Sequence, residues 1–242
     1  MGVYLITIAI KDLQWDGEYY LHDYEWRTGL TCQITGAMSV LSGEVSVMLV
    51  ALISAERMTK IAFPFHCSGL TPKVTHVLCL VIWLIGALIA FLPMMGIQYF
   101  NDPDSDITYY GRSVVCIPLQ LNSYFPPGWE YSVAIFVGLN LAFLVFTVAA
   151  YLILFIKRKQ VRASSGNIGR ETSFAKRVLF IIFTNFAAWL PIIVIGIKSV
   201  VDTSDQLPGE LSVWMAVFVL PVNAAINPVL YTLTTPQVFL YW

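Results

Sequence analysis

Long apolar runs alternate with short polar segments along this chain. Five of the runs are long enough to cross the roughly 30 Å hydrocarbon core of a bilayer as helices. Each of them provides the apolar length that a membrane helix needs, with few charges inside it. The pattern therefore predicts membrane helices at residues 30–60, 72–98, 131–158, 174–200 and 210–234.

The first residues are apolar as well, but they are too few to cross a bilayer. As a helix, Met1–Ile10 rises only about 15 Å. We interpret this segment as the outer end of a helix that begins upstream, and we expect the start of the bundle to lie outside this sequence. The predicted fold class is an all-α membrane protein, in the form of a fragment of a helix bundle.

Composition and charge agree with a membrane protein. Hydrophobic residues make up 57% of the chain and charged residues only 12%, against about 25% charged in soluble domains. The connections 11–28, 99–130 and 198–210 are mostly acidic, whereas 57–73 and 157–177 are mostly basic. Because Lys and Arg stay on the cytoplasmic side, the acidic connections are expected outside and the basic ones inside. The lipid bilayer is thus the first predicted partner.

Two cysteines fall on the outer side of this topology. Cys32 lies at the outer start of a predicted helix and Cys116 lies in the long outer connection, so both face an oxidising compartment. They are candidates for a disulfide, and the alternative is two unpaired outer thiols. Cys67 and Cys79 fall in an inner connection and inside a helix, where thiols are expected to stay reduced.

The pair Glu56-Arg57 stands at the inner end of the helix at 30–60. An Arg at this position often reaches toward the lipid headgroups, which is the simpler interpretation. The alternative is a switch, because neighbouring Glu and Arg side chains can hold each other in one state. In the other state the guanidinium, always charged and fork-shaped, turns to a cytosolic partner.

A proline inside the helix at 174–200 predicts a bend. Pro191 removes one backbone hydrogen bond and shares a helical turn with Trp189, so the helix is expected to bend near residues 187–188. The bend is either a hinge that moves or a static kink of the kind common in membrane helices.

Polar residues inside the helices form a further group of candidates. Glu44 is the only acidic residue well inside a predicted helix. Because a lipid-facing carboxylate is costly, it should face the bundle, in either a ligand- or state-dependent role or a structural one. In the last helix Asn223 shares a face with Asn227, Pro228 frees a carbonyl, and Tyr231 brings a hydroxyl to the inner surface.

Catalytic chemistry finds little support in this sequence. We identify no Gly-rich phosphate loop and no His/Cys cluster at metal-ligand spacing, and the three histidines are scattered. No enzyme, cofactor, metal site or nucleic-acid site is predicted. Two other classes stay open: a transporter or channel with a polar path inside the membrane, and a binding protein that does not signal.

Several motifs occur together in one order: Cys32, Glu56-Arg57, Trp83, Trp189-Leu190-Pro191 and Asn227-Pro228-Val229-Leu230-Tyr231. With these motifs the chain resembles the rhodopsin-like G-protein-coupled receptors. Within that class it is similar to the leucine-rich-repeat-containing receptors, most of all the relaxin-family peptide receptors. The glycoprotein-hormone receptors match less well. The stretches that carry this closer similarity are Met1–Ile6, Glu44–Val47, Tyr131–Phe136, Ala175–Arg177 and Ile226–Thr235.

The resemblance implies a bundle of seven membrane helices, of which this chain holds the end of the second through the seventh. The first helix and a leucine-rich-repeat ectodomain are then expected upstream. The resemblance also implies a multi-pass protein of the plasma membrane with a peptide hormone as ligand. A heterotrimeric G protein is the implied inner partner, and a rise in cyclic AMP is the implied response.

Roles of single residues follow from the same resemblance. It implies that Cys32 and Cys116 form the outer disulfide and that Arg57 faces the G protein, with Tyr151 and Tyr231 as its partners in the active state. The activation switch that the family implies comprises Glu56, Arg57, Tyr151, Asn227, Pro228 and Tyr231.

The family also implies that Trp189 is a toggle and Pro191 a hinge. Two residues of the same helix depart from the family pattern. Ala188 replaces the usual Cys, a minor change, and Asn185 stands where these receptors usually carry an Asp. Loss of that carboxylate weakens the expected resting-state contact between the last two helices, so basal activity is expected to be raised.

Overall fold

The apolar runs form long helices in the computed structural model of the chain, which describes residues 1–62, 70–102, 105–118, 125–162, 169–201 and 213–226. Residues 213–226 are helical and include the π turn η5 (Met215–Val219). No strand occurs in these ranges, which confirms the predicted all-α fold. The α-helices are α1 (Gly2–Gln14), α2 (Tyr19–Thr28), α3 (Leu30–Ala62), α4 (Pro72–Phe91), α5 (Trp129–Val133), α6 (Asn140–Arg162) and α7 (Gly169–Val201).

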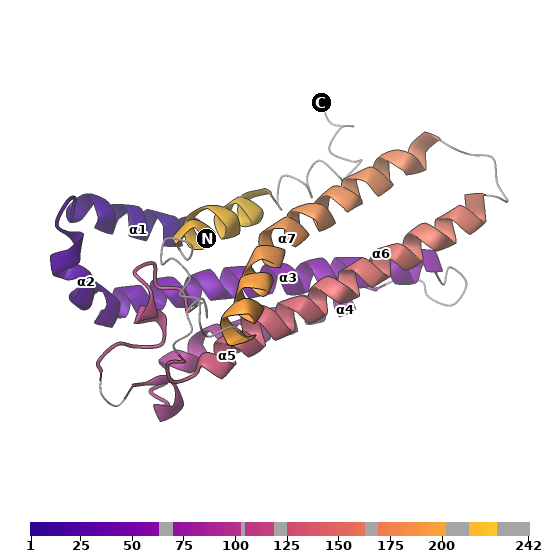
Figure 1. Ribbon diagram of the computed structural model, residues 1–242. Helices are drawn as coiled ribbons and strands as arrows, with labels where there is room; N and C mark the ends of the chain where they lie inside the picture. Colours follow the sequence, from indigo (N-terminus) through magenta and orange to yellow (C-terminus); the bar gives the residue numbers. More distant parts are fainter. Residues whose placement is uncertain (63–69, 103–104, 119–124, 163–168, 202–212, 227–242) are drawn as a thin grey trace.

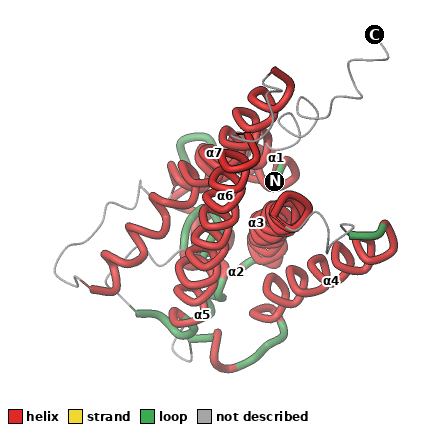
Figure 2. The backbone as a smooth tube through the Cα atoms, turned by 90° about the vertical axis from the view of Figure 1, so that its right-hand side faces the viewer, coloured by secondary structure: helices red, strands yellow, loops and turns green. Residues whose placement is uncertain are grey.

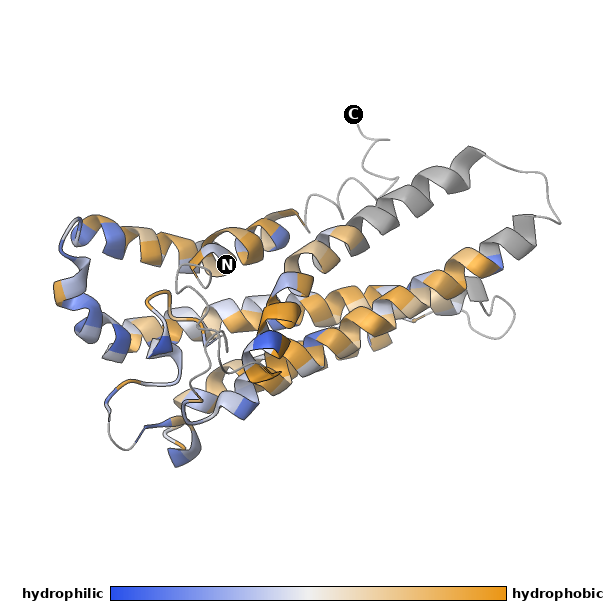
Figure 3. Cartoon of the chain, in the orientation of Figure 1, coloured by the Kyte–Doolittle hydropathy of each residue, from blue (hydrophilic) through white to orange (hydrophobic). Residues whose placement is uncertain are grey.

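Three stretches of helix are long and apolar enough to cross a bilayer, namely Leu30–Thr59, Pro72–Met94 and Trp129–Lys157. Two shorter apolar helical stretches, Phe186–Val201 and Met215–Ile226, belong to the described parts of the last two predicted helices. Figure 3 shows that hydrophobic residues dominate the long helices, whereas hydrophilic residues concentrate around α2 and the nearby connections. The chain is a multi-pass membrane protein.

Helix α3 lies at the centre of the described bundle. It packs along α6 and α4 and also contacts α1 and α2, and Figure 2 shows it between α4 and the pair α6 and α7. Small residues let its neighbours approach: a Cβ at Gly36 would collide with the Cys116 carbonyl and the Tyr110 ring. Side chains on α3 therefore contact most of the bundle, and a buried polar group there can connect several helices.

Helix α4 presents a broad apolar face to the surroundings of the bundle. Large side chains along it are exposed, a pattern that in a soluble protein would be an aggregation site. In a bilayer the lipid chains cover this face. The most exposed of these residues are Val77, Leu80, Trp83, Leu84 and Leu88.

The structure shortens one predicted helix. The prediction extended this helix to residue 98, but α4 ends at Phe91 and the 3₁₀ turn η1 (Leu92–Met94) follows. Pro93 has no N–H to donate to the carbonyl of Ile89, so one hydrogen bond of the regular helix is missing where α4 ends. The Tyr131 hydroxyl donates to the Ile89 carbonyl at 2.8 Å and satisfies it from a neighbouring helix.

The first acidic connection is also more regular than the sequence suggested. The sequence predicts only an outer connection for residues 11–28, yet α1 continues to Gln14 and α2 fills most of the remainder. The Trp15 ring stacks on His22 at 5.0 Å between ring centroids and meets the Trp26 ring edge-on at 6.1 Å. These aromatic contacts give α2 an apolar side that packs inward, with Trp26 buried, while Glu25 on the same helix is exposed.

Helix α7 contains Pro191 in its interior. Figure 1 shows that this helix changes direction part-way along its length, as a missing backbone hydrogen bond allows. The bend separates the half that begins at Gly169 from the half that ends at Val201.

Candidate functional site

A buried polar contact joins α3 to the start of α6 in the middle of the bundle. Glu44 is 0% exposed and Asn140 is 1% exposed. The Asn140 side-chain N–H group donates to Oε1 of Glu44 at 3.1 Å. Such groups are costly in a membrane unless they find partners, so this contact fixes how the two helices face each other.

The position of Asn140 depends on an irregular turn in its own helix. Residues Ala134–Leu139 form the π turn η4 directly before α6. A π turn interrupts the regular α-helical hydrogen bonds and often occurs at functional sites. Nδ2 of Asn140 also donates to the Ile135 carbonyl at 3.2 Å, so the same amide bonds this turn and Glu44.

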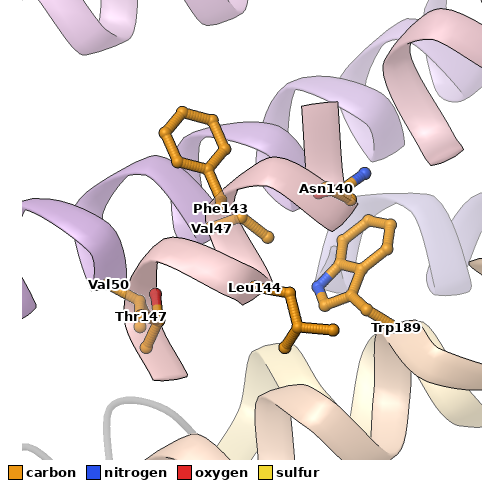
Figure 4. Close-up of a pocket in the computed structure, with 7 residues that line it drawn as sticks. All are labelled: Val47, Val50, Asn140, Phe143, Leu144, Thr147 and Trp189. Carbon is orange, nitrogen blue, oxygen red and sulfur yellow. The ribbon is translucent and has the colours of Figure 1, made fainter. Parts of the chain in front are cut away.

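Trp189 of α7 lies close to this contact. Its side chain is 4% exposed, and a Cβ at Gly43 would lie 3.6 Å from Cη2 of the indole. Position 43 of α3 therefore lies directly against the indole. Trp189 also lines a small pocket between α3, α6 and α7 that Figure 4 shows in close-up; the lining residues are Val47, Val50, Asn140, Phe143, Leu144, Thr147 and Trp189.

A second group of polar residues lies at the inner end of α3. Arg57 is exposed and Glu56 is partly buried. Tyr151 of α6 interacts with the Ser54 side chain and with the charge of Arg57. The Ser54 hydroxyl in turn donates to the Val50 carbonyl at 2.7 Å. The structure therefore brings Arg57 and Tyr151, which the family pattern relates, into the same region.

The outer loop that carries Cys116 is tied to the helices. Cys116 forms a disulfide with Cys32 at the outer end of α3. The Tyr4 hydroxyl donates to the Val115 carbonyl at 2.8 Å. The Val114 carbonyl accepts from the Tyr19 hydroxyl at 3.0 Å and from the Trp26 indole at 2.8 Å. The disulfide and three side-chain donors thus hold the backbone of this loop against α1, α2 and α3.

The protonated hydroxyl of Tyr19 is needed for its hydrogen bond to the Val114 carbonyl. Burial raises the pKa of Tyr19 to about 12, and the nearby charge of Asp23 adds to the rise. Because burial disfavours the phenolate, the Tyr19 hydroxyl stays a hydrogen-bond donor at neutral pH. A further donor is Arg27, whose Nε donates to the Gly111 carbonyl at 2.6 Å and which is itself paired with Asp23 at 3.2 Å.

The sequence matches the family described as "7 transmembrane receptor (rhodopsin family)" over residues 7–231. The chain belongs to this family. It is 37% identical over 237 residues to the G-protein coupled receptor GRL101 of Lymnaea stagnalis, in an alignment that covers 97% of this chain and 20% of that protein. It is 36% identical over 240 residues to relaxin receptor 1 of Homo sapiens, with 97% and 31% of the two chains covered.

The lutropin-choriogonadotropic hormone receptor of Callithrix jacchus is 27% identical over 237 residues, with 97% of this chain and 32% of that protein covered. The similarity to relaxin receptors inferred from the motifs is therefore confirmed, and the glycoprotein-hormone type matches less well. This rhodopsin-family chain spans about a fifth to a third of the length of these curated relatives. Its family places it in the plasma membrane.

Several residues that the sequence singled out lie beyond what the structure describes. Asn227, Pro228 and Tyr231 fall outside the described residues, and the backbone of Asn185 lies in α7 but its side chain is not described. Asn223 is buried in the last helix. Asn140 was not among the residues predicted from the sequence. An Asn inside a membrane helix is nevertheless a signal, because a buried amide needs hydrogen-bond partners, and Glu44 can supply one.

Proposed function

We propose that this chain is the transducing core of a receptor that passes an extracellular peptide-hormone signal to a heterotrimeric G protein. The observation that carries the proposal is the continuous path along α3. The helix starts at the tethered outer loop, passes the Glu44–Asn140 contact and the Trp189 indole, and ends at Arg57. A movement of the outer end of α3 can thus be transmitted to its inner end through one continuous helix.

The proposed mechanism is a shift between two arrangements of the helices. In one, Arg57 stays with its neighbours at the end of α3; in the other, it turns toward the G protein, with Tyr151 as an inner partner. Agonist would favour the second arrangement only by binding it more tightly than the first. Pro191 and Trp189 lie where α7 would have to move, since the helix already departs there from regular geometry.

The ligand class is proposed from the relatives. Two of them are named for relaxin and lutropin, and the identity to relaxin receptor 1 is higher. We therefore infer a relaxin-like peptide, captured by a leucine-rich-repeat ectodomain upstream of this chain, with cyclic AMP as the raised messenger. A glycoprotein-hormone type of ligand, or a receptor without a known hormone, is the alternative. Asn185 in place of an acid is expected to raise activity in the absence of ligand.

The experiment is G-protein nucleotide exchange by the full-length receptor in membranes, with and without relaxin-like peptides. Exchange should rise with peptide and fall to the background in Arg57→Ala. Lys73→Ala is the matched control, because it removes one positive charge from the same side at an exposed position of α4. If all three proteins reach the surface and bind peptide but none stimulates exchange, the protein is a binder that does not signal.

Ion or substrate flux in reconstituted vesicles distinguishes a receptor from the remaining alternative, a transporter or channel. A receptor of this type should show none above empty vesicles. Flux that depends on Glu44 and Asn223 would instead support a transporter.

A further inference from the structure

An arginine of α2 holds the backbone of the outer loop at two points. Nε of Arg27 donates to the Gly111 carbonyl at 2.6 Å, and Nη2 donates to the Arg112 carbonyl at 3.3 Å. Both carbonyls belong to the 3₁₀ turn η3 (Tyr110–Arg112) of that loop. Nη1 of Arg27 is paired with Asp23, one helical turn earlier in α2, at 3.2 Å. One planar guanidinium therefore fixes η3 against α2, with a fork of donors that a lysine does not have.

The backbones of α2 and η3 also approach each other closely. A Cβ at Gly111 would collide with the backbone carbonyl of Arg27. Position 111 therefore requires glycine for the close approach that lets the Arg27 side chain reach the Gly111 carbonyl. A displacement of α2 should then carry η3 with it.

A second arginine joins the same turn to the start of α5. The Arg112 side chain donates to the Pro127 carbonyl and, at 3.4 Å, to the Phe100 carbonyl. Pro127 lies directly before the N-cap residue of α5. The Arg112 guanidinium lies 4.7 Å from the centre of the Tyr109 ring, and the Tyr109 hydroxyl is 2.9 Å from the hydroxyl of Ser132 in α5. The turn η3 is thus bonded to α2 on one side and to α5 on the other.

We propose that Arg27 and Arg112 are positioning residues, which pass a displacement of α2 through η3 to the start of α5. Figure 1 shows α2 and α5 toward the same end of the bundle. The path continues from α5 through the π turn η4 to Asn140, so it ends at the Glu44–Asn140 contact with α3. The inference rests on the proposed function, because it gives a peptide signal at α2 a route to the contact between α3 and α6.

The first test separates peptide binding from signalling in the full-length receptor. Arg27→Gln and Arg112→Gln should keep the wild-type peptide affinity measured without G protein. The peptide concentration for half-maximal nucleotide exchange should rise by about 3- to 10-fold, as expected when one contact of a coupling path is lost. Arg27→Lys, which keeps the charge but loses the fork, should give a shift in the same direction. A merely structural role would lower surface expression without this shift in the receptors that reach the surface.

Two further variants separate the contact from the charge. Lys11→Gln is the control, because it removes a positive charge at the outer end of α1, where the Lys11 ammonium lies 4.7 Å from the centre of the Trp15 ring. It should leave the half-maximal concentration unchanged. Gly111→Ala keeps both arginines but forces η3 away from α2, so it should shift the half-maximal concentration as Arg27→Gln does.

The double variant Arg27→Gln/Arg112→Gln tests whether the two arginines act in series. In one path, loss of either link breaks the connection, so the double variant should shift the half-maximal concentration no further than the larger single shift. Independent contributions would multiply the two shifts, which would overturn the proposal. Normal exchange by the wild-type receptor with unshifted arginine variants overturns this inference alone. A wild-type receptor that binds peptide without any exchange overturns the proposed function, and this inference with it.

Discussion

Replacing Tyr4 by Phe tests how the outer loop is held to the bundle. The buried Tyr4 hydroxyl donates to the Val115 carbonyl at 2.8 Å, between residues 111 positions apart in sequence. In Tyr4→Phe the ring remains and only this donor is lost, so the Val115 carbonyl loses the side-chain donor that reaches it from α1. A buried group left without its partner costs about 1–3 kcal/mol. Each kcal/mol corresponds to a fall in melting temperature of about 2–4 °C in a domain of this size.

Tyr19 offers a matched comparison at the neighbouring carbonyl. Its hydroxyl donates to the Val114 carbonyl, which also accepts from the indole of Trp26. Tyr19→Phe therefore leaves that carbonyl with a partner, and the loss should stay below about 1 kcal/mol. Tyr20→Phe is the control for removing a tyrosine hydroxyl, because Tyr20 is 75% exposed. The melting temperature of this variant should equal that of the wild-type protein.

The assay is thermal unfolding of the purified full-length receptor in lipid nanodiscs for all three variants. The expected order of melting temperatures is Tyr4→Phe lowest, then Tyr19→Phe, then Tyr20→Phe. If Tyr4→Phe unfolds at the wild-type temperature, or no lower than Tyr19→Phe, then the loop is not held by this hydrogen bond and the reasoning is refuted.

Substitutions at three other positions test the rest of the bundle. Cys116→Ser removes the disulfide and should lower stability by about 2–4 kcal/mol, measured as lost surface expression and a lower melting temperature; unchanged values would contradict a structural role. Glu44→Gln keeps an acceptor for the Asn140 amide, whereas Glu44→Leu removes it. The Leu variant should therefore have a melting temperature several degrees below that of the Gln variant. Equal melting temperatures would argue against this contact. Gly43→Val places branched carbon against the Trp189 indole and should alter peptide-stimulated nucleotide exchange at normal surface expression, and exchange like the wild type would separate this contact from signalling.

The apolar runs were sufficient to predict the all-α membrane fold, because a helix that spans a bilayer needs a length and a composition that no loop has. The end of α4 could not be placed as well. Its apolar run continues past Pro93, and a proline can end a helix or lie inside one, as Pro191 does in α7. The carbonyl of Ile89 that Pro93 leaves free accepts from Tyr131 of another helix, a contact that the sequence does not reveal. Helix α2 was not predicted either. Its acidic residues are typical of a polar connection, and the sequence alone does not show that its aromatic residues pack on Trp15.

The Glu44–Asn140 contact was likewise only partly predictable from the sequence. The cost of a lipid-facing carboxylate is enough to expect Glu44 inside the bundle, where it is found. Its partner could not be named from the sequence, because Asn140 reaches Glu44 only where the π turn of η4 sets the register of α6. That turn reflects competition between an amide side chain and the backbone for the same carbonyls, which hydrophobic periodicity does not report.

The central claim is that a peptide bound outside changes the arrangement of helices at the inner face. We would measure it with spin labels at residue 73, at the inner start of α4, and residue 171, at the inner start of α7, in the full-length receptor with its reactive cysteines replaced. Relaxin-like peptide together with G protein should move the distance distribution to longer values, and Arg57→Ala should weaken this change. A distribution that stays the same while the peptide is bound would contradict the account.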